Sequence, residues 1–386
     1  MDRRTLLRAT VAGAGGLVLP FTAWSTAYAA PAQNAASPYG PLQAADANGI
    51  QLPAGFTSQV IARSGQVVPG TSYVWHSAPD GGAVIPNGSG WIYVSNAETS
   101  ATSGGGASMI SFNSSGQITG ASRILSGTNN NCAGGKTPWN TWLSCEEISL
   151  GRVWETYPLG GAAVVRPAMG RFKHEAAAAD PVRKVIYLTE DETDGRFYRF
   201  VPTTWGDLSA GTLQVLVAGT ATSGTFTWAT VPDPDGSPTV TRRQVSGAKV
   251  FNGGEGCHYA NDTVWFTTKG DNRVWQVNLA NNTYELAYDD NLVNPGPAPL
   301  TGVDNVTGST FGDLYVAEDG GNMEICMITP DDTISVFLRI NGQSSSEITG
   351  PAFTHAGDRL YFSSQRGTTG SSTGGITYCV TGPFRT

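Results

Sequence analysis

The sequence predicts an all-β protein, a six-bladed β-propeller, on the basis of its composition and a repeat. The 386 residues include 49 glycines and 22 prolines while only 14% are charged, which favours many turns and short strands over long helices. A strand pattern, in which an aliphatic and an aromatic residue precede a polar or acidic cluster, occurs six times. The copies are spaced at about 45–50 residues except for one longer interval, a period typical of propeller blades. Their aromatic residues are Tyr93, Trp142, Tyr187, Trp265, Tyr315 and Tyr361.

The N-terminus has the pattern of an export signal. Arg3-Arg4 precede the apolar run 9–21, and Ala27-Tyr28-Ala29 is a small-x-small cleavage site. The arginine pair indicates the twin-arginine route, so we expect residues 1–29 to be removed from an exported protein, periplasmic or extracellular. The alternative is an ordinary secretory signal with an incidental arginine pair. Residues 30–54, rich in Ala, Pro, Gln and Asn, are expected to form a loose leader.

Residues 55–386 are expected to form a single propeller domain. The long interval in the repeat contains a segment at about 220–245, rich in Thr, Pro, Asp and Gly, which we interpret as an insertion. The run 56–63 lies before the first blade, and we expect it to complete the last blade and close the ring. The alternative organisation is a sandwich array or two β domains, which near-even spacing of the repeats disfavours.

Acidic residues recur where each blade reaches one face of the disc. In an up-and-down blade the first strand begins, and the second ends, at the same face, so both places surround the channel mouth. Carboxylates this close repel one another unless cations or protons intervene. We therefore predict a metal cluster at the mouth of the central channel. The predicted first-strand starts are Asp80, Glu175, Glu255, Asp304 with Asn305, and Glu347; the predicted second-strand ends include Glu98, Cys145 with Glu146 and Glu147, Glu190 with Asp191, Lys269, Glu318 with Asp319, and Arg366.

The donor types in this set indicate which cations it suits. Oxygen donors dominate and suit hard cations such as calcium, whereas a thiolate among them suits a softer or redox-active metal such as iron. Of the five cysteines, Cys145 stands beside two glutamates at a predicted second-strand end, and we single it out.

Charge and hydropathy exclude two classes of partner. The formal net charge is −8, and the expected signal removes more arginines than acids, so the exported chain is more acidic still. An acidic protein is a poor ligand for nucleic acid, whose phosphate backbone requires basic surfaces. From residue 31 onward no run is long and apolar enough to span a membrane. We expect a monomer acting on a small molecule.

Several motifs together carry a family resemblance. From residue 72 to residue 384 the chain resembles the PhoX-type alkaline phosphatases, which implies a twin-arginine-exported six-bladed propeller. The resemblance also implies a cluster of iron and calcium that binds a phosphate monoester for hydrolysis. The matching segments are NAETS, WLSCEE, RFKHEAAAADP with YLTEDE, GEGCHYANDTVWFTTKGDN, VDN with LYVAED, and SEITGPAFTHAGDRLYFSSQRG.

The resemblance also implies roles for individual residues. Cys145 would be the iron-ligating thiolate, with Glu146 as its acidic neighbour, and replacing Cys145 by Ala would remove iron and activity. His174, which precedes Glu175, could bind the metal itself, but we expect it to orient the carboxylate of Glu175 instead. The further ligands implied are Glu175, Glu255, Asp304, Asn305 and Glu318, together with Glu98, Glu190 and Glu347.

One departure from the family pattern concerns the substrate. An arginine that holds the substrate phosphate in the family is replaced here by Gly253, and we expect Lys269 or Arg366 to supply that cation. Two alternatives stay open. One is a calcium-dependent propeller lactonase or related ester hydrolase, and the other is a non-catalytic, metal-stabilised binding propeller.

Overall fold

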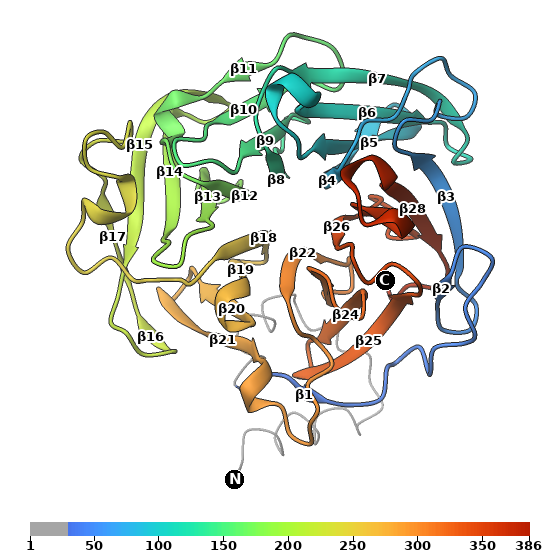
Figure 1. The fold of residues 1–386 in the computed structure, drawn as a ribbon. Coiled ribbons are helices and arrows are strands. Elements are labelled where there is room, and N and C mark those ends of the chain that lie inside the picture. Colours follow the sequence, from blue (N-terminus) through green and yellow to red (C-terminus); the bar gives the residue numbers. More distant parts are fainter. Residues whose placement is uncertain (1–29) are drawn as a thin grey trace, which may run out of the picture.

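Six β-sheets surround a central channel in the computed structural model, which describes residues 30–386 (Figure 1). Apart from short 3-10 turns, the described part of the chain contains no helix. The predicted six-bladed propeller is therefore confirmed. The expected export signal, residues 1–29, lies outside the described residues. No described helix has the length and apolar character needed to cross a membrane.

Each blade consists of consecutive antiparallel strands, the first lying innermost. Blade 1 contains β4 (Pro79–Asn87), β5 (Gly90–Ala97), β6 (Gly106–Phe112) and β7 (Ile118–Ser126). Blade 2 contains β8 (Asn131–Lys136), β9 (Trp142–Glu146), β10 (Val153–Thr156) and β11 (Val164–Val165). Blade 3 contains β12 (His174–Asp180), β13 (Val185–Glu190), β14 (Phe197–Thr204) and β15 (Asp207–Val217).

The remaining blades follow the same order. Blade 4 contains β18 (Gly254–Ala260), β19 (Thr263–Thr268), β20 (Arg273–Asn278) and β21 (Thr283–Asp289). Blade 5 contains β22 (Val303–Gly308), β23 (Leu314–Glu318), β24 (Glu324–Thr329) and β25 (Thr333–Ile340). Blade 6 contains β26 (Ile348–Phe353), β27 (Arg359–Ser364) and β28 (Ile376–Thr381).

An N-terminal strand closes the ring. β3 (Thr57–Arg63) pairs antiparallel with β28 and forms the outermost strand of blade 6. This pairing, which the sequence predicted for residues 56–63, joins segments from opposite ends of the chain (Figure 1). It supplies the fourth strand of the last blade and so closes the ring with residues from the N-terminal side of the first blade.

The segment 30–54 is more ordered than the loose leader we expected. β1 (Gln33–Asn34) pairs parallel, and β2 (Ile50–Gln51) antiparallel, with β25 at the outer edge of blade 5. Ala32 and Ile50 are buried there. The polar composition is misleading because a few apolar residues are enough to attach the segment to a blade edge.

The segment at about 220–245 adds strands to two neighbouring blades. β16 (Gly224–Thr225) pairs with β21 of blade 4, and β17 (Thr227–Thr230) pairs with β15 of blade 3. The segment therefore bridges the outer edges of these blades, far from the channel.

The aromatic residues of the repeat form the centre of the core. All six lie on the second strands of the blades, and each is at most 3% exposed. They pack in apolar clusters together with strands of adjacent blades. This packing fixes the second strands, and so determines where their polar ends emerge.

Candidate metal centre

The first two strands of every blade share an irregularity near one face of the disc. In blades 1 to 5 a β-bulge places two residues of the first strand opposite one residue of the second, directly after the first residue pair. In blade 6 the bulge begins one residue later. A bulge breaks the alternation of side chains and redirects one of them. The first bulge residues of blades 1 to 5 are Asp80, Cys132, Glu175, Glu255 and Asp304.

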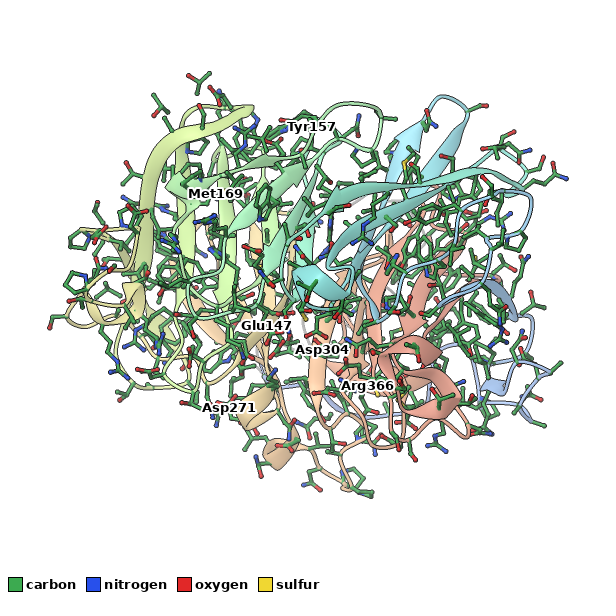
Figure 2. The ribbon with its side chains drawn as sticks, turned by 45° about the horizontal axis from the view of Figure 1, so that its top comes forward. Glu147, Tyr157, Met169, Asp271, Asp304 and Arg366 are labelled. Carbon is green, nitrogen blue, oxygen red and sulfur yellow. The ribbon has the colours of Figure 1, made fainter. Side chains whose placement is uncertain are left out.

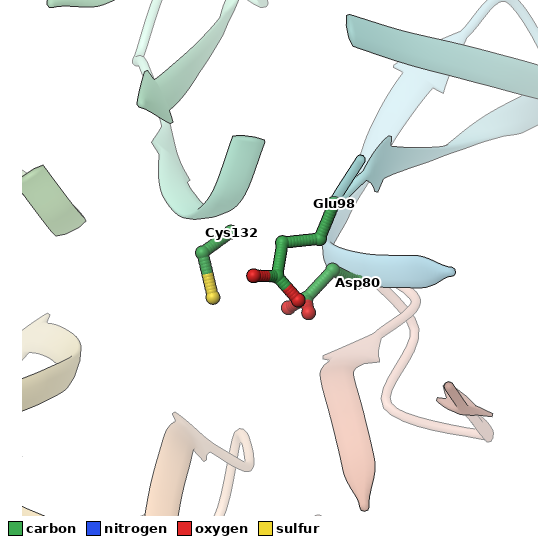
Figure 3. A group of neighbouring side chains, drawn as sticks. All are labelled: Asp80, Glu98 and Cys132. Carbon is green, nitrogen blue, oxygen red and sulfur yellow. The ribbon is translucent and has the colours of Figure 1, made fainter. Parts of the chain in front are cut away.

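These five residues, which we call the channel ring, lie close enough to share cations. Their donor atoms, with those of Glu98 and Glu147, form three groups in which all donors lie within 4.8 Å of one another. Cys132 and Glu175 each belong to two groups, so the donors form a continuous arc across blades 1 to 5. The groups are Asp80, Glu98 and Cys132 (Figure 3); Cys132, Glu147 and Glu175; and Glu175, Glu255 and Asp304.

The channel ring is an environment that solvates negative charge poorly. Burial raises the pKa of Glu175 and of Asp304 well above the usual values, and neighbouring carboxyl groups add to the rise. Burial and the same acids raise the pKa of the Cys132 thiol. Among the residues described, neither carboxyl oxygen of Glu175 has a hydrogen-bond partner. Buried carboxyl oxygens without partners, surrounded by other acids, are groups that a bound cation would satisfy, so this donor set fits a metal site.

The thiol at the mouth is Cys132, not Cys145. Cys145 lies on β9 opposite the bulge, fully buried in an apolar cluster with Leu143 and Phe172. It belongs to none of the donor groups in the described chain. Sequence reasoning missed Cys132 because β8 reads NCAGGK, which contains no β-branched or aromatic residue. The available signal was that blade 2 alone lacked a residue among the predicted first-strand starts of blades 1 to 5.

Three acids that we expected to be ligands connect turns instead. Glu146, Glu190 and Glu318 are the last paired residues of their second strands, and each accepts backbone N–H bonds from adjoining turns. Glu318 also lies in a separate buried group with Glu324 and Cys326. Both oxygens of Glu318 accept backbone N–H groups, from Thr301 and Glu324, which ties this acid to the turns of blade 5.

The residue after each of these turn acids reaches the channel mouth. Successive side chains along a strand point to opposite faces, so a shift of one residue changes the partner. Glu147 joins the donor groups of the channel ring. Asp191 forms ion pairs with lysines at the mouth, and Asp319 lies against Glu347.

Two amide side chains hold carboxyl groups of the site in place. Asn305 Nδ2 donates to Asp304 Oδ1 at 2.8 Å, and its Oδ1 accepts a backbone N–H of blade 6 at 2.7 Å. Asn305, which we expected to be a metal ligand, therefore orients the carboxylate of Asp304, which belongs to the channel ring. Gln365 Nε2 donates to Asp80 Oδ2 at 2.5 Å and to Glu98 Oε2 at 2.6 Å.

Both cations expected to contact substrate lie at the mouth. Lys269 Nζ is 2.7 Å from Glu255 Oε1, and Arg366 Nη2 is 2.9 Å from Glu347 Oε1. In Figure 2, Arg366 and Asp304 both lie toward the middle of the molecule. Glu347 itself precedes β26 and is buried, while Arg366 is partly exposed, and Glu347 lies outside the three donor groups.

His174 does not orient Glu175 as we expected. Its ring stacks on Phe172 with centroids 3.6 Å apart, and its Nε2 is 3.0 Å from the carbonyl oxygen of Gly170. Burial lowers the pKa of His174 to about 4, which keeps the ring neutral. His174 is therefore a core residue of blade 3.

A cavity of about 510 Å³ occupies the channel beneath the ring. Its wall consists of the first strands, which are rich in glycine and alanine directly after the bulge. Within the described chain, the lining includes no carboxylate side chain. The acids are thus confined to one mouth of the channel.

Comparisons with known proteins give one family match and several similar folds. The sequence matches the family model for alkaline phosphatase PhoX over residues 93–163 and 158–289. The structure is similar to that of Pseudomonas fluorescens PhoX in complex with vanadate, a transition-state analogue, with a TM-score of 0.72 at 17% identity, covering 91% of this chain and 98% of that one. It is also similar to a gluconolactonase from Xanthomonas campestris, with a TM-score of 0.53 at 12% identity, covering 90% and 99%. No curated protein matches the sequence.

Proposed function

Because the chain belongs to the alkaline phosphatase PhoX family, we propose that it hydrolyses phosphate monoesters at a multinuclear metal centre in the channel mouth. Members of this family are phosphoric ester hydrolases. The observation that carries the proposal is the repeated bulge, which brings buried carboxyl groups and the Cys132 thiol within 4.8 Å of one another in overlapping groups. Such a donor set has no evident use in a propeller without cations, because mutual repulsion would only destabilise it.

The three donor groups of the channel ring would hold calcium and iron. Oxygen donors from Glu175, Glu255 and Asp304 suit calcium, whereas the groups that contain Cys132 suit iron. Bound cations would polarise a phosphoryl oxygen and offset the charge that develops during hydrolysis. Binding would require deprotonation of the thiol and the carboxyl groups, so it would release protons.

The side chains of the mouth would bind and orient the substrate. We propose that Lys269 and Arg366 contact phosphoryl oxygens, since their charged groups stand at the mouth and are partly exposed. Gln365 and Asn305 would keep the ring carboxyl groups from rotating, which maintains the spacing between cation sites.

We also propose that the protein is exported by the twin-arginine route, to the periplasm or beyond, and acts as a monomer. That route carries folded proteins, and here an N-terminal strand of the mature chain closes blade 6. Residues 55–386 would form the propeller domain, with 30–54 attached to blade 5.

Metal analysis tests the proposal most directly. Protein purified without chelator is expected to contain iron and calcium, to show a visible thiolate-to-iron charge-transfer band, and to hydrolyse p-nitrophenyl phosphate at alkaline pH. If colourless, iron-free protein has full activity, iron is not part of the metal centre. Fully metal-loaded protein that hydrolyses no phosphate ester would contradict the phosphatase function.

A second candidate function is a calcium-dependent lactonase. The observation in its favour is the likeness of the fold to the Xanthomonas gluconolactonase. It predicts lactone hydrolysis by protein that holds calcium but no iron. Absence of lactone turnover in calcium-loaded protein would exclude it.

A further inference from the structure

Two lysines at the mouth share one carboxylate oxygen. Lys173 Nζ is 2.6 Å, and Lys269 Nζ is 3.0 Å, from Asp191 Oδ2. The two ammonium groups therefore cannot be farther apart than the sum of these distances. Each also contacts a second acid, Glu147 at 3.0 Å for Lys173 and Glu255 at 2.7 Å for Lys269.

The lysines come from equivalent levels of neighbouring blades. Lys173 directly precedes β12 of blade 3, and the matching position before β18 of blade 4 is Gly253. A Cβ atom at Gly253 would lie only 3.1 Å from Lys269 Cγ. The aliphatic part of the Lys269 side chain thus occupies the space that a side chain at position 253 would need. The ammonium groups of Lys173 and Lys269 therefore approach each other from adjacent blades.

Both ammonium groups remain available to a ligand. The side chains of Lys173 and Lys269 are 31% and 38% exposed, whereas that of Asp191 is 8% exposed. An ammonium group has three N–H donors, and each lysine uses two of them on carboxylates here. Asp191 Oδ2 contacts both ammonium groups, so this buried carboxylate holds the two lysines together at the mouth.

We propose that Lys173 and Lys269 form a two-ammonium site for the phosphoryl group of the substrate, and that Asp191 positions both. This inference rests on the proposed function and adds the recognition of the phosphate dianion to it. A dianion with several equivalent oxygens can accept a charge-assisted hydrogen bond from each lysine. The alternative is that the lysines serve only as counter-ions to the acids of the mouth.

The experiment uses metal-loaded protein and inorganic phosphate as the probe. Phosphate affinity is measured by calorimetry and as competitive inhibition of p-nitrophenyl phosphate hydrolysis, and metal content is measured for each variant. The variants are Lys173→Met, Lys269→Met and Asp191→Asn. Lys184→Met is the matched control, because Lys184 is an exposed lysine in the β12–β13 turn at the opposite end of the strands.

Each lysine variant is expected to weaken phosphate binding about tenfold or more, with normal metal content, because it loses a hydrogen bond between charged groups. Asp191→Asn should raise KM more than it lowers kcat, and the control should behave as wild type. Unchanged phosphate affinity in metal-loaded Lys173→Met would overturn the inference. If the lysine variants lose metal, and the molecules that keep metal bind phosphate as wild type does, the lysines serve only as counter-ions to the acids of the mouth. If wild type binds phosphate but turns over no ester, the proposed function fails, and the calorimetric comparison still decides the lysine site.

Discussion

Two sets of acids lie on neighbouring strands of the blades, one at the ends of second strands and one at the starts of first strands, and they have different roles. Glu146, Glu190 and Glu318 end the pairing of their second strands and accept hydrogen bonds from turns. The channel ring, in contrast, starts on the bulges of the first strands, where Glu175 has no hydrogen-bond partner among the described residues. The difference teaches that acids bonded to the backbone of turns contribute to the fold, whereas Glu175, with both oxygens unsatisfied among the described residues, is available to a cation.

The largest contrast is expected between the two cysteines of blade 2. Cys132→Ala should abolish the thiolate-to-iron band and phosphatase activity, because among the residues described Cys132 is the only thiol in the donor groups of the channel mouth. Cys145→Ala should keep both and cost about 1–2 kcal/mol of unfolding free energy, as a small cavity in the core does. Visible spectra and denaturant melts of the two variants measure this. If Cys145→Ala loses the thiolate-to-iron band and Cys132→Ala keeps it, Cys145 is the thiol that binds iron.

The next contrast is between two glutamates of blade 3. Glu175→Gln should lower metal affinity by at least about 100-fold, which exceeds the usual effect of changing a residue that only supports a ligand. Glu190→Gln should leave metal content unchanged, since Glu190 bonds to a turn and to Tyr198. Metal titration of both chelator-stripped variants provides the comparison. Equal losses would show that the turn acid also binds the cation.

A smaller effect is expected for the amide that holds two of the acids. Gln365→Leu removes the donor to Asp80 and Glu98 but no ligand, so metal affinity should fall roughly 10-fold to 100-fold with the spectrum shifted rather than lost. Gln343→Leu is the matched control and should retain metal, because Gln343 lies in the connection between β25 and β26 and its amide donates to Tyr378 Oη. If the spectrum and the metal affinity of Gln365→Leu equal those of the wild type, Gln365 does not position Asp80 and Glu98.

The last contrast concerns the pH dependence of stability and the turn acid Glu190. Burial raises the pKa of Glu190 to about 7. A carboxyl whose folded pKa lies above its unfolded value binds more protons in the folded state, so stability falls as pH rises between about 4.5 and 7, by roughly 3 kcal/mol at most. Glu190→Gln should flatten this slope in metal-free protein, as measured by denaturant unfolding at several pH values. An unchanged slope would show that Glu190 does not titrate in this range.

The sequence by itself determined the blade count, the ring closure by residues 56–63 and the face on which acids gather. These follow from a repeat of strand patterns and from the rule that strand starts and ends alternate between faces. Glu175, Glu255, Asp304 and Glu98 could be identified as members of the site because first-strand starts and strand ends are visible as breaks in the apolar pattern.

Only the tertiary structure decided which of two adjacent residues faces the channel. The side-chain period of a strand is two, so the last paired residue of a second strand and the residue after it point to opposite sides, and Glu147 and Asp191 reach the mouth in place of Glu146 and Glu190. On the first strands a bulge of one residue turns Cys132 and Glu175 toward the channel. Nothing in the apolar pattern of the sequence marks a bulge, because it arises where the first strands of neighbouring blades pack around the channel. The same packing recruited Cys132 from a strand whose sequence has almost no β-strand character.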